Sequence, residues 1–298
     1  MEEARKKRVQ RLKKIIVATV ITLLILPSVF CVILALKVGS LQRQVEELKK
    51  ETHKSLEIVW SDSGSQTIGA DSNGNMDDVT NALAEDGRKR VYLTFDDGPS
   101  IYTEDILDVL KRYNVKATFF VTGMNAGQYD EYYQKILDDG HALGIHTYSH
   151  VYQDIYESLE AFQEDFLKMQ DHIYQLTGEK VKLYRFPGGS ANEVVAPEVR
   201  EEILQWLKEE GIVYYDWNVS SGDAENRIPS AEKIAQNCIK GVENCNTAMV
   251  LLHDSGGKKS TIEALPLIIE GINQLDNTIL LPMDEETVAI QQIKSTNE

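Results

Sequence analysis

Residues 91–98 read Val-Tyr-Leu-Thr-Phe-Asp-Asp-Gly, a β-rich apolar run that ends in two adjacent carboxylates and a glycine. Six more short β-rich runs follow along the chain, and stretches with helical spacing separate them. A succession of strands and helices predicts an α/β domain with a parallel sheet and right-handed crossovers. The predicted strands are residues 91–95, 117–121, 142–146, 181–186, 212–217, 248–253 and 278–282. The predicted helices are residues 104–113, 130–139, 154–176, 197–210, 231–241 and 261–275.

Residues able to do chemistry stand at the carboxyl ends of several of these strands. In chain order they are Asp96, Asp97, His146, Arg185, Asp223 and His253. In a barrel, these strand ends form one ring of loops that faces a common site. In a flat sheet, the first and sixth strands could lie far apart. We therefore expect a distorted (β/α) barrel of about seven parallel strands.

Two clusters, TFDDG at residues 94–98 and HTYSH at residues 146–150, together indicate a divalent-metal hydrolase site. His146 and His150 are four residues apart and can meet one ion from a single helical turn or a tight loop. One aspartate and two histidines make three protein ligands, which leaves a coordination position open and a second aspartate free for proton transfer. Each cluster alone is weaker evidence, because Asp-Asp-Gly-Pro is also a turn sequence and His-x-x-x-His occurs by chance.

The N-terminal part of the chain predicts a membrane anchor. Residues 15–36 are 22 residues without a charge, about 33 Å as a helix, which is enough to cross the hydrocarbon layer. A cleavable signal peptide is the alternative, but the run is long for one and no clear small-x-small cleavage site follows it. By the positive-inside rule we expect a protein of the cell membrane with an extracellular catalytic domain. The expected parts are a basic cytoplasmic tail (1–14), a transmembrane anchor (15–38), a helical stalk and flexible spacer (39–88), and the catalytic domain (89–298).

The charge distribution argues against one class of partner. Of the 31 basic and 47 acidic residues of the chain, seven basic and two acidic ones lie in residues 1–14, which leaves 24 basic and 45 acidic residues in 15–298. Such an acidic body has no basic stripe to neutralise phosphates, so we expect no nucleic acid partner. Cys238 and Cys245 fall in the part predicted to be exported, where a disulfide and two free thiols both fit the spacing.

Five ordered motifs resemble those of the polysaccharide deacetylases of the NodB-homology type, carbohydrate esterase family 4. The resemblance covers about residues 90–284. The motifs are TFDDG at 94–98, HTYSH at 146–150, RFPGG at 185–189, a tryptophan-to-aspartate stretch at 217–223 and LLH at 251–253. The resemblance implies a polysaccharide N-deacetylase that acts on an acetylated glycan polymer and holds a divalent metal. The metal would most often be Zn²⁺, with Co²⁺ or another divalent ion as the alternative.

The resemblance implies a role for the residues of the first three motifs. Asp97, His146 and His150 would hold the cation. Asp96 would be the general base that deprotonates the water at the open coordination position. Arg185 would orient Asp96 and keep it ionised, because an opposite charge nearby favours the carboxylate.

The last two motifs would supply the proton for the leaving group. On the family pattern His253 is the general acid that protonates the leaving amine. Asp223 would be its carboxylate partner and favour the charged form of the ring. Asp216 is a rival for this role, but the spacing of Asp223 from Trp217 fits the family better.

The substrate pocket departs from the family pattern at two positions. Gly188, which follows Pro187, stands where members usually carry an aromatic residue, and Ala224 stands where they usually carry tryptophan. The backbone N–H near Gly188 would stabilise the oxyanion together with the metal. The candidates to replace the missing apolar surface are Trp217, Tyr214, Tyr215 and Leu251.

The predicted membrane topology and the resemblance to the deacetylase family together predict removal of N-acetyl groups from an extracellular amino-sugar polymer. N-acetylglucosamine of peptidoglycan is the favoured substrate, and a chitin-like or other acetylated glycan is the alternative. A catalytically impaired glycan-binding or scaffolding protein of the cell envelope is an alternative of another class, supported only by Gly188 and Ala224. A metal-dependent amidohydrolase acting on something other than a sugar is a third. The sequence leaves the oligomeric state open.

Overall fold

A computed structural model of the chain describes residues 87–225, 227 and 229–293. The predicted cytoplasmic tail and membrane anchor, and all but the last two residues of the predicted stalk and spacer, lie outside the described residues. Within the described part, no helix has the length and apolar character needed to cross a membrane.

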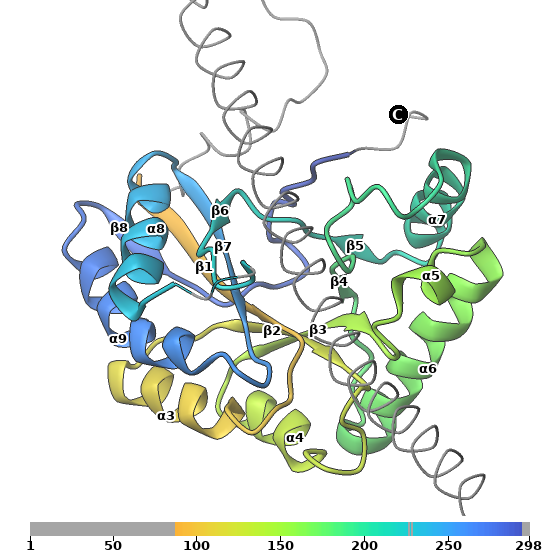
Figure 1. The fold of residues 1–298 in the computed structure, drawn as a ribbon, viewed down its shortest axis with the longest axis horizontal. Helices are drawn as coiled ribbons and strands as arrows, with labels where there is room; N and C mark the ends of the chain where they lie inside the picture. Colours follow the sequence, from red (N-terminus) through yellow and green to blue (C-terminus); the bar gives the residue numbers. More distant parts are fainter. Residues whose placement is uncertain (1–86, 226, 228, 294–298) are drawn as a thin grey trace, which may run out of the picture. The chain divides into compact units, whose positions relative to one another are not determined.

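The described residues form an α/β domain in which parallel strands alternate with helices (Figure 1). The strands are β1 (Lys89–Asp96), β2 (Thr118–Thr122), β3 (Ala142–Thr147), β4 (Leu183–Tyr184), β5 (Val213–Tyr214), β6 (Val219–Ser220), β7 (Thr247–His253) and β8 (Thr278–Leu280). The helices are α3 (Thr103–Tyr113), α4 (Glu131–Asp138), α5 (Tyr152–Ile155), α6 (Leu159–Thr177), α7 (Pro197–Glu209), α8 (Ala231–Glu243) and α9 (Lys259–Asn273).

The strands form a distorted half-barrel rather than a closed ring. Seven strands follow the order β5-β4-β3-β2-β1-β7-β6, and β8 pairs with β1 off this path. Among the described residues, no ladder joins β5 to β6. The helices lie around the strands in an arc from α8 and α9, past α3 and α4, to α6 and α7 (Figure 1). The predicted barrel is therefore found only in part.

The strand order shows that the candidate site residues can meet without a closed barrel. The first and sixth predicted strands do not need closure to meet, because β7 pairs directly with β1. Their register places Asp96 beside His253. A crossover that inserts β7 next to β1 thus brings together residues far apart in the sequence.

Alternation along β1 separates two layers of side chains. Val91, Leu93 and Phe95 face the larger core against the helices. Tyr92 faces the other side, in a smaller apolar cluster with Phe120, Leu183, Tyr215, Met249, Met283 and Ile290. Since successive side chains point to opposite faces, Thr94 and Asp96 continue the face of Tyr92 towards the carboxyl end. A polar layer therefore stands above an apolar one.

The segment after β8 occupies the open side of the half-barrel. The backbone N–H of Asp216 donates to the carbonyl of Ile290 at 2.7 Å. The Tyr215 hydroxyl donates to the carbonyl of Thr287 at 3.1 Å. The C-terminal segment thus satisfies the backbone N–H of Asp216, just after β5, and the Tyr215 hydroxyl on the side where the sheet is open.

Three element predictions were wrong in detail. The helix expected over residues 154–176 is divided into α5 and α6, because Ser158 caps α6: its backbone is extended and its Oγ accepts from the Ala161 N–H at 3.2 Å. The strand expected over residues 181–186 is only β4. The strand expected over residues 212–217 is only β5, and a further short strand, β6, follows it.

Candidate metal and hydrolytic site

The three predicted metal ligands come together at the carboxyl ends of β1 and β3. Ligand atoms of Asp97, His146 and His150 all lie within 4.8 Å of one another. Asp97 Oδ1 is 3.6 Å from His146 Nε2 and 3.3 Å from His150 Nε2. Tetrahedral ligands at about 2.0–2.1 Å from one zinc ion are about 3.3–3.4 Å apart. The donor set therefore fits a divalent metal ion in both chemistry and spacing.

The tautomer of His146 is fixed by its backbone partner. Its Nδ1 lies 2.7 Å from the carbonyl oxygen of Arg185. A carbonyl oxygen can only accept, so Nδ1 carries the proton and the lone pair of Nε2 faces Asp97. Burial lowers the pKa of His146, which favours the neutral ring that a metal ligand requires.

Two of the three ligands have unusual backbone conformations. Asp97 has a φ of 73° and His150 a φ of 57°, in the left-handed region that costs a residue with a Cβ about 1–2 kcal/mol. Such strain persists only where the surroundings over-determine it, and it gathers at functional sites. Here the strain turns both side chains towards one point.

The loop that carries the histidines is held by Asp165, a residue that the sequence analysis missed. Asp165 Oδ1 accepts from the Thr147 hydroxyl at 2.5 Å and from the Tyr148 N–H at 2.7 Å, and Oδ2 accepts from the Ser149 N–H at 2.9 Å. Asp165 is three residues after Phe162 and shares its buried face of α6. An acidic residue on the apolar face of a helix was the signal that could have identified it.

Glycine in the Asp-Asp-Gly motif is required by a close approach. A Cβ on Gly98 would lie 2.5 Å from Asp254 Oδ2. Asp254 is fully buried and accepts from the hydroxyls of Ser100 and Thr103, at 2.6 Å each. Burial raises the pKa of Asp254 to about 6. This carboxyl, also missed from the sequence, fixes the turn that follows Asp97, a predicted metal ligand.

Arg185 and Asp96 form a buried ion pair beside the ligands. Arg185 is fully buried and Asp96 is 3% exposed. Arg185 Nη1 donates to Asp96 Oδ1 at 2.9 Å and to Thr94 Oγ1 at 2.7 Å. Nε and Nη2 donate to the carbonyls of Tyr215 (3.0 Å) and Asp216 (3.2 Å). The guanidinium is therefore fixed along its edges, and Asp96 keeps a second oxygen, 4.0 Å from His146 Nε2, towards the ligand cluster.

His253 lies against Asp223. Asp223 Oδ1 is 2.7 Å from His253 Nδ1, and Oδ2 accepts from the His253 N–H and from the Thr261 hydroxyl, at 2.9 Å each. Burial alone would lower the pKa of His253, but the hydrogen bond and charge of Asp223 outweigh it and raise that pKa. The rival residue, Asp216, accepts instead from Ser190 and from the Gln292 N–H.

The expected apolar wall is only partly made of the expected residues. The half-buried Trp217 ring lies 6.0 Å from the Arg185 guanidinium, and the buried Leu251 pairs with Ser220 of β6. Tyr214 and Tyr215 point into the cores instead of a pocket, since Tyr214 packs edge-on against Phe186 and Tyr215 belongs to the smaller apolar cluster.

The loop of the third motif is bordered by Tyr152, which was not anticipated. Gly188 is exposed and has a φ of 77°, and a Cβ there would lie 3.0 Å from Tyr152 Cε2. The buried Pro187 accepts at its carbonyl from the Tyr156 hydroxyl at 2.9 Å. Among the described residues, no acceptor pairs with the Gly188 N–H. Ala224, the other departure from the motif pattern, is exposed.

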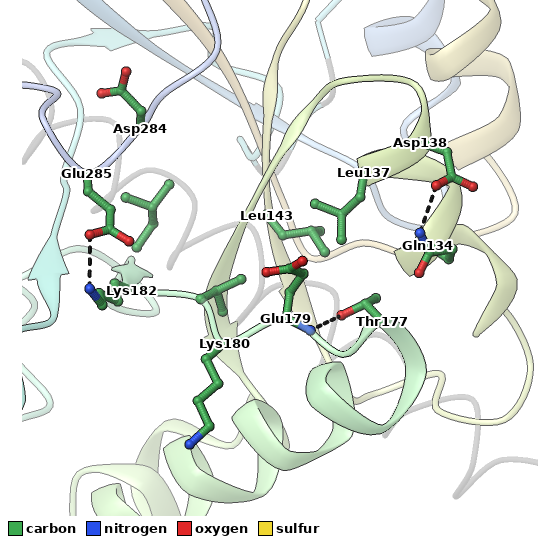
Figure 2. A pocket seen from close by; sticks show the side chains of 12 residues that line it. Gln134, Leu137, Asp138, Leu143, Thr177, Glu179, Lys180, Lys182, Asp284 and Glu285 are labelled. Carbon is green, nitrogen blue, oxygen red and sulfur yellow. Dashed lines mark hydrogen bonds and ion pairs between the residues drawn. The ribbon is translucent and has the colours of Figure 1, made fainter.

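A separate pocket lies at the opposite ends of the strands (Figure 2). Its walls include Leu143 near the start of β3 and Leu183 at the start of β4. Lys182, one of the residues that line it, forms an ion pair with Glu285, with Nζ 3.0 Å from Oε2. None of the motif residues lines this pocket, so the candidate site is the cluster at the carboxyl ends.

The two cysteines left open by the sequence are not bonded to each other. Cys238 is buried in α8 and Cys245 follows that helix, and both are free thiols. Neither contributes a ligand to the cluster.

Comparisons with known proteins identify the family. Residues 84–213 match the family model described as polysaccharide deacetylase. The chain is 31% identical over 191 residues to a peptidoglycan-N-acetylglucosamine deacetylase of Bacillus cereus, a match that covers 63% of this chain and 67% of the relative. A second Bacillus cereus protein of the same name is 33% identical over 190 residues, covering 61% of this chain and 62% of the relative.

A solved structure agrees with this assignment. The catalytic domain of peptidoglycan N-acetylglucosamine deacetylase from Eubacterium rectale superposes with a TM-score of 0.66 at 39% identity, over 72% of this chain and 97% of that domain. The chain belongs to the polysaccharide deacetylases, the enzymes of carbohydrate esterase family 4. About a third of the length of each Bacillus cereus relative lies outside the match.

Proposed function

We propose that this chain hydrolyses N-acetyl groups of N-acetylglucosamine in peptidoglycan. The observation that carries the proposal is the Asp97, His146 and His150 cluster, with the buried Asp96 and the partly buried His253 on the neighbouring strands β1 and β7. Zinc is the proposed ion, with Co²⁺ or another divalent ion as the alternative occupant. The substrate is supported by the names of the relatives, which are peptidoglycan N-acetylglucosamine deacetylases.

Each residue of the cluster has a proposed task. Asp97, His146 and His150 hold the ion, which when bound polarises a carbonyl and makes water more acidic. Asp96 takes a proton from the attacking water through the oxygen that Arg185 leaves unpaired.

The proton for the leaving group comes from the other strand. His253, whose Nδ1 is held by Asp223, presents Nε2 to the leaving amine and donates its proton. A base on β1 and an acid on β7 can then act on the same amide, because the register aligns Asp96 with His253. The unpaired Gly188 N–H and the half-buried Trp217 are proposed to border the acetyl group.

We further propose that the chain is anchored in the cell membrane by residues 15–38, with its N-terminus in the cytoplasm and its catalytic domain outside. The support is the uncharged run of residues 15–36 behind a basic tail. Labelling of intact cells with a membrane-impermeant reagent specific for an epitope at the C-terminus tests this orientation. Labelling only after the cells are permeabilised would contradict it.

Acetate release tests the activity. The full chain, in detergent, is incubated with intact peptidoglycan after chelator treatment and again after addition of Zn²⁺ or Co²⁺. We expect metal-dependent acetate release, and glucosamine in place of N-acetylglucosamine in the digested product. Acetate release from chitin oligomers but not from peptidoglycan would move the substrate to a chitin-like glycan. No acetate from any acetylated glycan with any ion would favour the glycan-binding alternative.

A further inference from the structure

Tyr152 occupies a position between a metal ligand and an exposed loop of the site. Its ring lies 5.3 Å from the ring of His150, at an interplanar angle of 74°. Tyr152 also lies close to Gly188, where a Cβ would lie 3.0 Å from Tyr152 Cε2 and 3.3 Å from its hydroxyl. Gly188 is exposed and Tyr152 is only half-buried, so this side of the cluster is open to solvent.

The ring is held in place by the elements that carry the motifs. Tyr152 begins α5 and packs edge-on against Tyr156, with ring centroids 6.1 Å apart. Tyr156 in turn stacks on Phe186 and donates its hydroxyl to the carbonyl of Pro187 at 2.9 Å. The loop after β3 and the loop after β4 are thus joined through this aromatic pair, which sets the direction of the Tyr152 ring.

The hydroxyl of Tyr152 has no protein partner in the described part of the chain. No described residue donates to it or accepts from it, whereas the hydroxyls of Tyr133, Tyr156 and Tyr215 each have a backbone acceptor. A tyrosine that borders a site usually uses its hydroxyl as a donor and its ring as an apolar surface. Here both are available to a ligand beside the metal cluster.

We propose that Tyr152 binds the substrate: its ring packs against the acetylated amino sugar and its hydroxyl hydrogen-bonds to that sugar. The inference rests on the proposed deacetylase function and assigns to it a residue outside the five motifs. Tyr152 takes up the space beside Gly188 that a side chain there would need, so the two positions lie side by side at the edge of the site.

Binding to an N-acetylglucosamine tetramer tests this role, even in the absence of turnover. Titration calorimetry measures the Kd of the tetramer for metal-loaded Asp96→Asn protein. It compares the parent, which keeps Tyr152, with the same protein carrying Tyr152→Phe or Tyr152→Ala. Loss of one neutral hydrogen bond should raise the Kd about threefold to tenfold in Tyr152→Phe. Loss of the ring as well should raise it further in Tyr152→Ala. In the active chain, Tyr152→Phe should raise KM by the same factor and leave kcat nearly unchanged.

Two controls separate this role from a structural one. Tyr174→Phe removes the same atom from a half-exposed tyrosine on α6, and it should leave the Kd at the parent value. Metal content should be unchanged in Tyr152→Phe, because the ring beside His150 remains. If Tyr152 only supports His150, Tyr152→Phe will bind the tetramer as the parent does, and that result would overturn the inference.

Two further outcomes also decide whether Tyr152 binds the substrate. A parent that binds no acetylated tetramer overturns the inference, since it names this sugar as the ligand. A parent that binds the tetramer more tightly than Tyr152→Phe, yet releases no acetate in the active background, supports the inference and rejects the proposed hydrolysis. The failure of one is therefore distinguishable from the failure of the other.

Discussion

Replacement of Arg185 by methionine tests the buried ion pair that holds Asp96, the proposed general base. The substitution leaves Asp96, 3% exposed, without its cation, and it removes the donors to the carbonyls of Tyr215 and Asp216. Removal of one partner from a buried pair costs about 3–5 kcal/mol. In a domain of about 200 residues, each kcal/mol shifts the melting temperature by about 2–4 °C, so the expected fall is about 6–20 °C.

Arg185→Lys is the matched control for charge. Lysine keeps a cation near Asp96 but lacks the planar fork, so it cannot reproduce the bonds to both backbone carbonyls. We expect Arg185→Lys to lower the free energy of unfolding by about 1–3 kcal/mol, so that its stability is intermediate between those of the wild type and the methionine variant. Acetate release should fall in both variants, because Asp96 loses its fixed orientation.

Thermal unfolding of the full chain, followed by circular dichroism, measures these differences. All variants are compared at the same saturating metal concentration, since an ion that binds only the folded state adds stability by mass action. A methionine variant that unfolds at the wild-type temperature would refute the reasoning. It would mean that Arg185 does not compensate the buried charge of Asp96.

Three further predictions concern the roles assigned to the site. Asp96→Asn should retain its metal and lose activity by a factor of about 10²–10⁴, as expected for a general base. Acetate release by this variant at the wild-type rate would contradict that assignment. His146→Ala should lower the metal content after dialysis, measured by elemental analysis, and full occupancy would contradict its place as a ligand. A general acid must be protonated, so activity should fall as pH rises through the raised pKa of His253. Asp223→Asn removes the group that raises this pKa, so the alkaline limb of the kcat profile should move to lower pH; an unshifted limb would argue against the pair.

The sequence predicts that the candidate site residues lie close together because parallel strands bring their carboxyl ends to one edge. His253 ends β7 as predicted, and Asp96, expected just after the first strand, is the last residue of β1. The strand order is not contained in those runs, since each run specifies a strand and not its neighbour. The direct pairing of β1 with β7, and the opening between β5 and β6, therefore required the structure.

The residues that the sequence did not reveal act through neighbours distant in the chain. Asp165 resembles the other acidic residues of its helix until its three bonds to residues 147–149 are seen. Tyr152 follows the second motif closely, but its importance depends on Gly188, 36 residues further on. Short spacing rules carry no signal for such contacts.

The balance of charge in the site gives an argument for a cation that does not depend on ligand spacing. Asp96 is paired with Arg185, and Asp223 with His253, whose pKa is raised. Among the described residues, the ion-pair partners of Asp97 are the imidazoles of His146 and His150 rather than an arginine or a lysine. Burial opposes the ionisation of Asp97, but the hydrogen bond from His150 and the nearby imidazoles lower its pKa, so it is charged. Burial lowers the pKa of His146, which leaves that ring neutral. The carboxylate of Asp97 therefore lies beside a ring that burial keeps neutral, at the point where the donor atoms converge, and a divalent cation there would balance its negative charge.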